Sequence, residues 1–278
     1  MKKVKWIGAF VALAALVSQQ VFAGPPLNNL QGVGGVAFNP LAYTADSSGE
    51  NSHYKVGDQD ILGKPRFGAW YVNLDHANVD WTTIGVAETF FDRVEVSYGY
   101  ESINQSGAQA IHKNNVGTKL LVLPENSFDT KFLPAVSVGG IYKDTSFRAE
   151  DVDSSGYDFY TVATKTITQL PQPVIVSGGL LVTKEKVTGV FGFDKDSAAT
   201  GFGNVDVVLP YNLVLGYEYK QGARYSDFKN ADYWDLHLAW LANNNLSLVL
   251  AYVDAGDSKS SKVVGLGNGV VLSTQYAF

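Results

Sequence analysis

Apolar and polar residues alternate with a period of two along most of the chain, in runs of about ten residues separated by clusters of Gly, Asn, Asp and Ser. In the clearest run, residues 93–101, apolar residues occupy every even position, and Arg93, Glu95 and Glu101 lie on the opposite face. The runs 212–220 and 234–241 repeat this pattern. A period of two is that of a β-strand whose two faces meet different surroundings. A helical period is almost absent, so the sequence predicts an all-β protein.

Counting these runs predicts about twelve antiparallel strands. Their spans are 67–76, 79–91, 93–102, 113–124, 132–143, 156–168, 173–184, 202–209, 212–221, 232–242, 246–254 and 268–278. From the second strand on, short connections (92, 125–131, 169–172, 210–211, 243–245) alternate with long ones (103–112, 144–155, 185–201, 222–231, 255–267). Transmembrane β-barrels have short periplasmic turns on one rim and long loops on the other. The connection at 77–78 departs from the rhythm because it should be long and is short.

The N-terminus has the features of a signal peptide. Three lysines precede the apolar run Trp6–Val17, and Val21-Phe22-Ala23 fits a cleavage site after Ala23. The run is too short to cross a bilayer, which needs about 20 residues, and no later apolar run reaches about 18 residues. Residues 1–23 are therefore predicted to be removed on export. Because only helices and closed barrels satisfy the backbone in lipid, a periplasmic β-protein and an outer-membrane barrel remain.

The last strand favours the barrel, over residues 66–278. Val270, Leu272, Thr274, Tyr276 and Phe278 alternate up to the final residue. This ending resembles the C-terminal signal by which the assembly machinery of the bacterial outer membrane recognises barrels. Tyr276 and Phe278 are therefore predicted to form the assembly signal. Outer-membrane lipid and lipopolysaccharide would be the other partners.

Aromatic residues near strand ends suggest two interfacial girdles. Trp81 and Phe91 share one face of their strand, and so do Trp234 and Trp240. We expect both pairs to face outward, because aromatic girdles mark both membrane interfaces. The buried face of a soluble sandwich would also collect aromatic residues, so this observation supports the barrel only together with the rhythm of the connections.

The composition excludes several function classes. Charged residues make up 17% of the chain, against about 25% in ordinary soluble domains. The chain has no Cys, which excludes disulfides, thiolate metal sites, iron–sulfur clusters and a Cys nucleophile. A net charge of −6 and a pI near 5.2 speak against a nucleic-acid-binding protein, which would carry a basic patch.

Residues 24–65 differ from the rest of the chain. A glycine-rich stretch, Gly32–Gly35, precedes an apolar run to Tyr43, and a polar stretch follows from Thr44 to Asp60. We expect a plug folded into the lumen. The alternatives are a periplasmic tail, or a further pair of strands that would raise the count to fourteen.

The inward faces carry charges of both signs, with acids in the majority. Charged rings in a lumen select ions and polar solutes, so an open lumen would favour cations and neutral solutes. The alternative is a closed network whose members satisfy one another. The lumen and selectivity candidates are Glu88, Arg93, Glu95, Glu101, Lys119, Asp206, Glu218, Lys220, Asp235 and His237.

No catalytic, metal or cofactor site is predicted. Of the four histidines, His53, His76 and His112 fall in tail, turn or loop, and only His237 lies on a lumen face. Nucleophilic catalysis needs a nucleophile, a base and an orienting group together, and no such set can be assembled. The glycine-rich stretches match no phosphate-binding loop. A Ser or Asp within reach of His76 or His237 would strengthen the hypothesis of a barrel hydrolase.

Three segments carry a family resemblance: Pro25–Leu30 (PPLNNL), Gly34–Tyr43 (GGVAFNPLAY) and Phe90–Glu95 (FFDRVE). In them the chain resembles a proteobacterial family of exported proteins of unknown function that are predicted to be outer-membrane barrels. The resemblance implies an architecture and the outer membrane of a Gram-negative bacterium, but no chemistry. The function expected first is porin-like passive passage of small solutes. The alternatives are a non-conducting structural or partner-binding barrel and, less favoured, a hydrolase.

Overall fold

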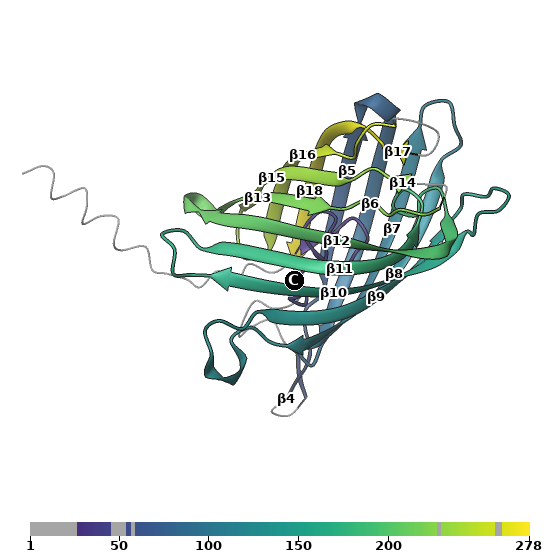
Figure 1. Ribbon diagram of the computed structural model, residues 1–278. Coiled ribbons are helices and arrows are strands. Elements are labelled where there is room, and N and C mark those ends of the chain that lie inside the picture. Colours follow the sequence, from purple (N-terminus) through teal and green to yellow (C-terminus); the bar gives the residue numbers. More distant parts are fainter. Residues whose placement is uncertain (1–26, 46–53, 57–58, 227–228, 259–262) are drawn as a thin grey trace, which may run out of the picture.

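A computed structural model describes residues 27–45, 54–56, 59–226, 229–258 and 263–278. The predicted signal peptide and its cleavage site after Ala23 lie outside these residues, as does His53. The described chain forms a closed antiparallel barrel of twelve strands in sequence order (Figure 1). The barrel strands are β5 (Arg66–Leu74), β6 (Val79–Phe90), β7 (Val94–Gln105), β8 (Ile111–Leu123), β9 (Ala135–Thr145), β10 (Ser155–Ile167), β11 (Val174–Glu185), β12 (Phe193–Leu209), β13 (Leu213–Lys220), β15 (Tyr233–Leu241), β16 (Leu246–Asp254) and β18 (Asn268–Ala277).

The ring closes where the last strand, β18, pairs with the first, β5, from Gly269↔Leu74 to Ala277↔Arg66. The all-β class, the antiparallel barrel and the twelve strands are thus confirmed. The main difference is β12, which begins at Phe193 rather than 202. Its added residues, 193–201, are mostly polar, so the apolar alternation that reveals a lipid-facing strand is missing there. The loop before β12 shrinks to residues 186–192 as a result.

Short elements connect or flank the barrel strands. The connection after β5 is short, as the sequence indicates. Asn78 adopts a left-handed conformation, and its N–H donates to the Asp75 carbonyl oxygen, which closes the turn η1. Among the described residues, no helix is long and apolar enough to cross a bilayer. The remaining elements are β1 (Leu27–Asn28), β2 (Gly34–Gly35), β3 (Tyr54–Val56), β4 (Gln59–Leu62), β14 (Lys229–Asn230), β17 (Val263–Val264), η1 (Asp75–Ala77), η2 (Ser127–Asp129) and η3 (Pro210–Asn212).

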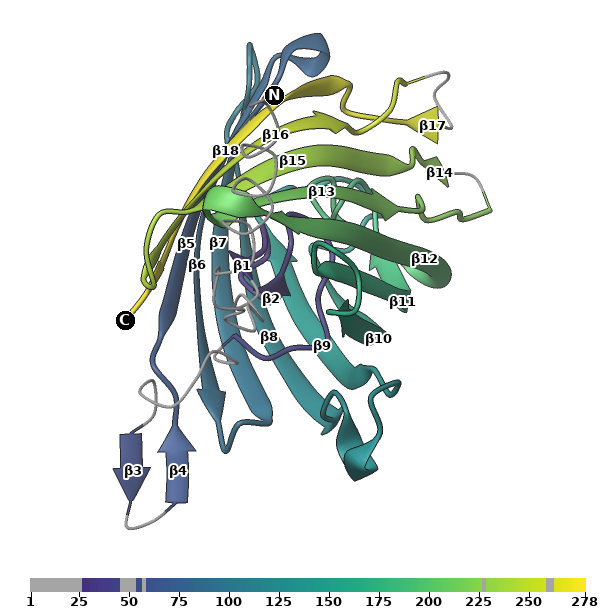
Figure 2. The ribbon, with the colours of Figure 1, turned by 90° about the vertical axis from the view of Figure 1, so that its left-hand side faces the viewer.

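The β3–β4 hairpin does not enter the ring. In the described part of the chain it meets β6 at the register pair Leu62↔Phe90 and through the two backbone hydrogen bonds beside it, and Figure 2 shows it beyond the rim that carries the short turns. The further pair of strands considered from the sequence therefore forms outside the barrel, and the ring keeps twelve members.

The outward face of the barrel is apolar across neighbouring strands. Tyr71, Leu272, Leu250, Leu238 and Leu215 stand in register on five adjacent strands, and each is exposed. A soluble protein rarely exposes a continuous apolar surface of this extent. In a barrel, such a band is the surface that faces lipid.

Aromatic residues flank this band, but not all of those predicted. Trp240 is exposed near the short-turn end of β15, and Trp234 lies half-buried on the same outward face near the other end. Phe91 is exposed in the turn after β6, whereas Trp81 is only 5% exposed and faces inward. The expectation that Trp81 faces lipid was wrong because the barrel interior is itself apolar near β5 and β6. Where both faces of a strand are apolar, the alternation of apolar and polar residues does not show which face points into the barrel.

Candidate functional site

The interior of the barrel contains the segment Leu27–Ala45, called here the N-terminal segment. Figure 2 shows this part of the chain, with β1 and β2, enclosed by the barrel strands. All its residues except Leu27 and Phe38 are buried. The segment turns back on itself because the Asn29 side chain accepts the N–H groups of Gln31 and Val33, at 2.9 and 3.0 Å.

Glycines allow the segment to approach the barrel wall closely. Gly32 has a φ of +86°, and a Cβ built on it would lie 2.5 Å from the Tyr98 carbonyl oxygen. On the wall, Gly85 of β6 and Gly99 of β7 are register partners. A Cβ on Gly85 would collide with Gly32, and a Cβ on Gly99 would collide with both Gln31 and Gly32. The two wall glycines thus leave a shallow depression, called here the glycine seat, which has room for the backbone of the segment but not for an added side chain.

Interior carboxylates bind the backbone of the segment. Glu218 of β13 accepts the N–H groups of Ala37 and Phe38, both within 3.1 Å, and that of Asn39. Glu95 of β7 accepts the N–H groups of Gly34 and Ala45, both at 2.8 Å. Charged acceptors make the stronger class of hydrogen bond. These contacts use the backbone of the segment and not its side chains.

A buried lysine completes this arrangement. Lys119 of β8 pairs with Glu95 at 2.9 Å and donates to the carbonyl oxygens of Gly34 and Leu41, at 2.8 and 3.2 Å. Both side chains of the ion pair are fully buried. Removing one partner of such a pair leaves an uncompensated charge, which is strongly destabilising.

Further contacts tie the segment to other parts of the wall. The Ala42 N–H donates to Thr164 Oγ1 of β10 at 2.8 Å. The Tyr43 hydroxyl donates to Glu125 Oε2 at 2.6 Å, and burial together with Glu125 raises the pKa of Tyr43. The segment therefore meets strands on opposite sides of the barrel.

Asn28 binds at the seam between β5 and β18. Its backbone N–H donates to Gln275 Oε1 of β18 at 3.1 Å, and its side-chain amide donates to the Arg66 carbonyl oxygen of β5 at 2.8 Å. Trp70 of β5 donates its indole N–H to the Asn28 carbonyl oxygen at 2.6 Å. One residue thus bridges the first and last strands of the ring.

The outer end of the interior, toward the long loops, holds a network of ion pairs. Lys143 of β9 pairs with Asp158 at 2.5 Å and with Glu185. Lys113 of β8 pairs with Glu101 at 2.9 Å, and all five side chains are almost completely buried. Lys220 of β13 also pairs with Glu185, at 3.4 Å, so three lysines balance three carboxylates in this network.

The loop 186–192 folds over this network. Lys113 donates to the Thr188 carbonyl oxygen at 2.6 Å, and the Val187 N–H donates to Asn230 Oδ1 at 2.8 Å. Val187 and Val190 are fully buried. The outer mouth is therefore lined by this loop, while the N-terminal segment lies deeper in the barrel.

His237 is held between two carboxylates. Its Nδ1 lies 2.6 Å from Asp235 and its Nε2 lies 2.8 Å from Asp206. On the neighbouring strand β13, Glu218 lies directly opposite Asp235 in register. A histidine that acts as a general base needs a ring nitrogen free to take a proton from a nucleophile. Two Asp side chains thus lie within reach of His237, which is the condition set above for the hydrolase hypothesis, but carboxylates occupy both ring nitrogens and leave neither free for a nucleophile.

Two comparisons place the chain among known proteins. The model of the family described as "Protein of unknown function (DUF3034)" matches residues 25–275. The chain belongs to this family. The predicted resemblance to a family of barrels of unknown function is thereby confirmed. No curated protein matches the sequence.

Three solved structures of porins are similar to this DUF3034 chain. The KdgM porin superposes with a TM-score of 0.55 at 11% identity, over 77% of this chain and 99% of that one. The KdgM porin in complex with disordered oligogalacturonate gives 0.51 at 12%, over 77% and 99%. The NanC porin gives 0.51 at 10%, over 76% and 98%. At such low identities the likeness shows the fold alone, which is that of an outer-membrane barrel.

The DUF3034 barrel places eight of the ten predicted lumen residues on its interior face, all of them buried: Glu95, Glu101, Lys119, Asp206, Glu218, Lys220, Asp235 and His237. The other two lie elsewhere. Glu88 lies on the outward face of β6 near its end, because the inward face of that strand carries Trp81. Arg93 is exposed in the turn after β6 and donates to the Leu121 and Val122 carbonyl oxygens at 3.4 Å.

Five interior charges are not among the residues predicted from the sequence: Arg66, Lys113, Lys143, Asp158 and Glu185. Lys113 shares the strand and the parity of Lys119, so the signal was present. Glu185 falls just beyond the predicted end of its strand at 184. No group of three His, Asp or Glu side chains suited to a metal ion occurs in the described ranges.

Proposed function

We propose that this DUF3034 barrel is an outer-membrane channel for small solutes, and that the N-terminal segment acts as its plug. The observation that carries the proposal is the binding of the segment backbone by Glu218, Glu95 and Lys119, from different sides of the lumen. A tail that merely lay in the lumen would not need charged residues positioned on its amide groups.

The plug is held in a way that permits release. Hydrogen bonds to charged groups contribute about 1.5–3 kcal/mol each, but water would satisfy Glu218 and Glu95 once the segment left. The wall does not depend on the segment for its backbone pairing, because each barrel strand pairs with both neighbours. Release of the plug would therefore leave a closed ring with a polar lumen.

The interior charges support passage of cations and neutral solutes. Among the described residues, the buried charged side chains are seven acids against Arg66 and four lysines, with His237 apart. The lysines are paired with acids, whereas Asp206, Glu218 and Asp235 gather on adjacent strands around His237. An acidic strip of this kind attracts cations in a lumen.

The outer membrane and its lipids are part of the proposal. The apolar band and its flanking aromatic residues suit lipid, and Tyr276 and Phe278 lie on the outward side, 44% and 54% exposed. We retain these two residues as the proposed signal for the assembly machinery, and lipopolysaccharide as the lipid of the outer leaflet.

Single-channel conductance in planar bilayers tests the proposal. We would compare the refolded chain without residues 1–23, a deletion of residues 27–45, and a locked variant with Val33→Cys and Gly117→Cys. A Cβ at Gly117 would lie 2.9 Å from Val33 Cγ2, so the two positions face each other directly, and the chain has no native Cys to compete for the bond.

The deletion should give discrete, cation-preferring steps, and the locked variant should be silent until a reductant is added. Conductance by the oxidised, locked variant would refute the plug. Silence from a correctly folded deletion variant would refute passage and favour the alternative, a non-conducting barrel with a structural or partner-binding role.

A further inference from the structure

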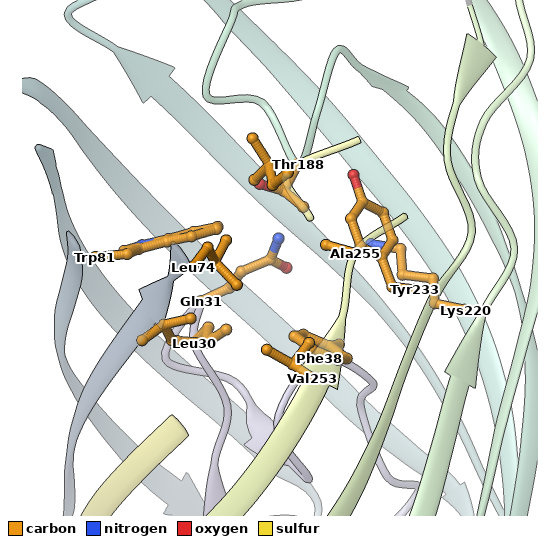
Figure 3. Close-up of a pocket in the computed structure, with 12 residues that line it drawn as sticks. Leu30, Gln31, Phe38, Leu74, Trp81, Thr188, Lys220, Tyr233, Val253 and Ala255 are labelled. Atoms are coloured by element: carbon orange, nitrogen blue, oxygen red, sulfur yellow. The ribbon is translucent and has the colours of Figure 1, made fainter. Parts of the chain in front are cut away.

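A cavity lies between the N-terminal segment and the long-loop rim (Figure 3). Leu30 and Phe38 of the segment form its inner side. Leu74 at the end of β5, Val253 of β16 and Leu266 of the loop before β18 form much of the rest. The ring of Phe38 packs on that of Tyr233, with centroids 6.2 Å apart. The lining is thus mostly apolar.

Three buried polar atoms on this lining lack a hydrogen-bond partner among the described residues: Trp81 Nε1, Tyr233 Oη and Thr188 Oγ1. Trp81 and Tyr233 are only 5% and 4% exposed. Buried polar groups almost always have a hydrogen-bond partner, so three unpaired polar atoms around one cavity indicate that a hydrogen-bonding group binds there. The indole N–H can only donate, while the two hydroxyls can donate or accept. The missing partner is therefore an acceptor.

The other polar groups of the cavity are already occupied. Gln31 Nε2 donates to Glu185 Oε1 at 3.2 Å, and Lys220 pairs with Glu185 at 3.4 Å. Because no cation is left unpaired on the lining, an anion has no counterion there. A sugar would bury many hydroxyls against apolar side chains, which is costly.

We infer that this cavity is a binding site for a small, uncharged, largely apolar molecule with one hydrogen-bond-accepting oxygen. The oxygen would lie among Trp81, Tyr233 and Thr188, and the apolar part would lie against Leu74 and Val253. The void measures about 30 Å³, more than the roughly 10–15 Å³ that one water molecule needs but well short of the roughly 150 Å³ cavity that takes up benzene. A ligand of the size of a benzene ring therefore enters by displacing the Phe38 side chain.

The site goes beyond the proposed channel and does not require conduction. Its test uses the folded chain without residues 1–23 in lipid nanodiscs, with ¹⁵N-labelled indole groups observed by NMR. The probes are benzyl alcohol and toluene, which differ in the hydroxyl group. Trp70 serves as an internal reference because its indole already donates to Asn28. The outward-facing Trp234 and Trp240 report any partitioning of the probe into lipid.

We expect benzyl alcohol to shift the Trp81 indole signal in a saturable way and to leave that of Trp70 in place. Tyr233→Phe should weaken benzyl alcohol by about 2- to 10-fold, the effect of one hydrogen bond, and leave toluene unchanged. Phe38→Ala should tighten both probes, whereas Phe202→Ala, at a buried Phe of β12 that does not line the cavity, should not.

Two results would overturn the site. One is the absence of a saturable Trp81 shift with benzyl alcohol in both the unmodified chain and Phe38→Ala, which would leave water as the partner of the three polar atoms. The other is an equal gain in affinity from Phe38→Ala and Phe202→Ala. Neither result depends on whether the barrel conducts, so the channel and the site are judged separately.

Discussion

Gly99→Ala adds one methyl group to the wall where the N-terminal segment passes closest to β7. The new Cβ would lie 2.5 Å from the Gln31 carbonyl oxygen and 2.9 Å from the Gly32 nitrogen. Both contacts involve backbone, so the segment must move by about 1 Å to restore ordinary van der Waals distances. Overpacking of this kind costs about 1–3 kcal/mol. The population of displaced segment should therefore rise about 5- to 150-fold.

Thiol labelling measures that population directly. Because the chain has no native Cys, Ala37→Cys provides a single thiol at a position that is 2% exposed in the seated segment. Its labelling rate is compared with and without Gly99→Ala. The matched control is Gly178→Ala on the outward side of β11, where a Cβ meets nothing closer than 3.8 Å. Equal labelling rates for Gly99→Ala and Gly178→Ala would refute the glycine seat.

Three further changes test the charges and the lipid face. Glu218→Gln keeps one acceptor oxygen but removes the charge that binds three amides, so channel openings should become about 10-fold more frequent in bilayer recordings; the exposed Glu150→Gln should have no effect. Lys119→Met leaves a buried carboxylate unpaired and should lower the free energy of unfolding by about 3–5 kcal/mol in urea titrations, and a loss below about 1 kcal/mol would contradict the burial of that pair. Leu238→Arg should cost about 2–4 kcal/mol in lipid vesicles, and a similar cost for Asn243→Arg in the exposed turn would contradict the lipid-facing band.

The strands could be predicted because most of them face lipid on one side and polar groups on the other. Residues 93–101 and 212–220 are examples, and both lie within observed strands or at their ends. The pattern failed where this contrast disappears. Trp81 faces an apolar interior, so both faces of β6 look alike, and the face of Glu88 was assigned wrongly as a consequence.

The contents of the lumen were only partly predictable. Glu95, Lys119 and Glu218 lie on the face of their strands opposite the apolar residues, and this was sufficient to place them inside the barrel. Nothing local in the sequence indicates that Glu218 binds the amides of residues 37–39, because these partners are about 180 positions apart. The orphan polar atoms of Trp81 and Tyr233 are likewise a property of the packed interior and have no counterpart in a strand pattern.

The position of Asn28 has a consequence for assembly. A barrel becomes a barrel only when its last strand reaches its first, and Asn28 holds both through Gln275 and Arg66. Asn28, which precedes every barrel strand in the chain, therefore helps to fasten the first barrel strand to the last. Loss of the Asn28 contacts should appear as slow or incomplete closure of the barrel during biogenesis, even where the strands themselves are intact.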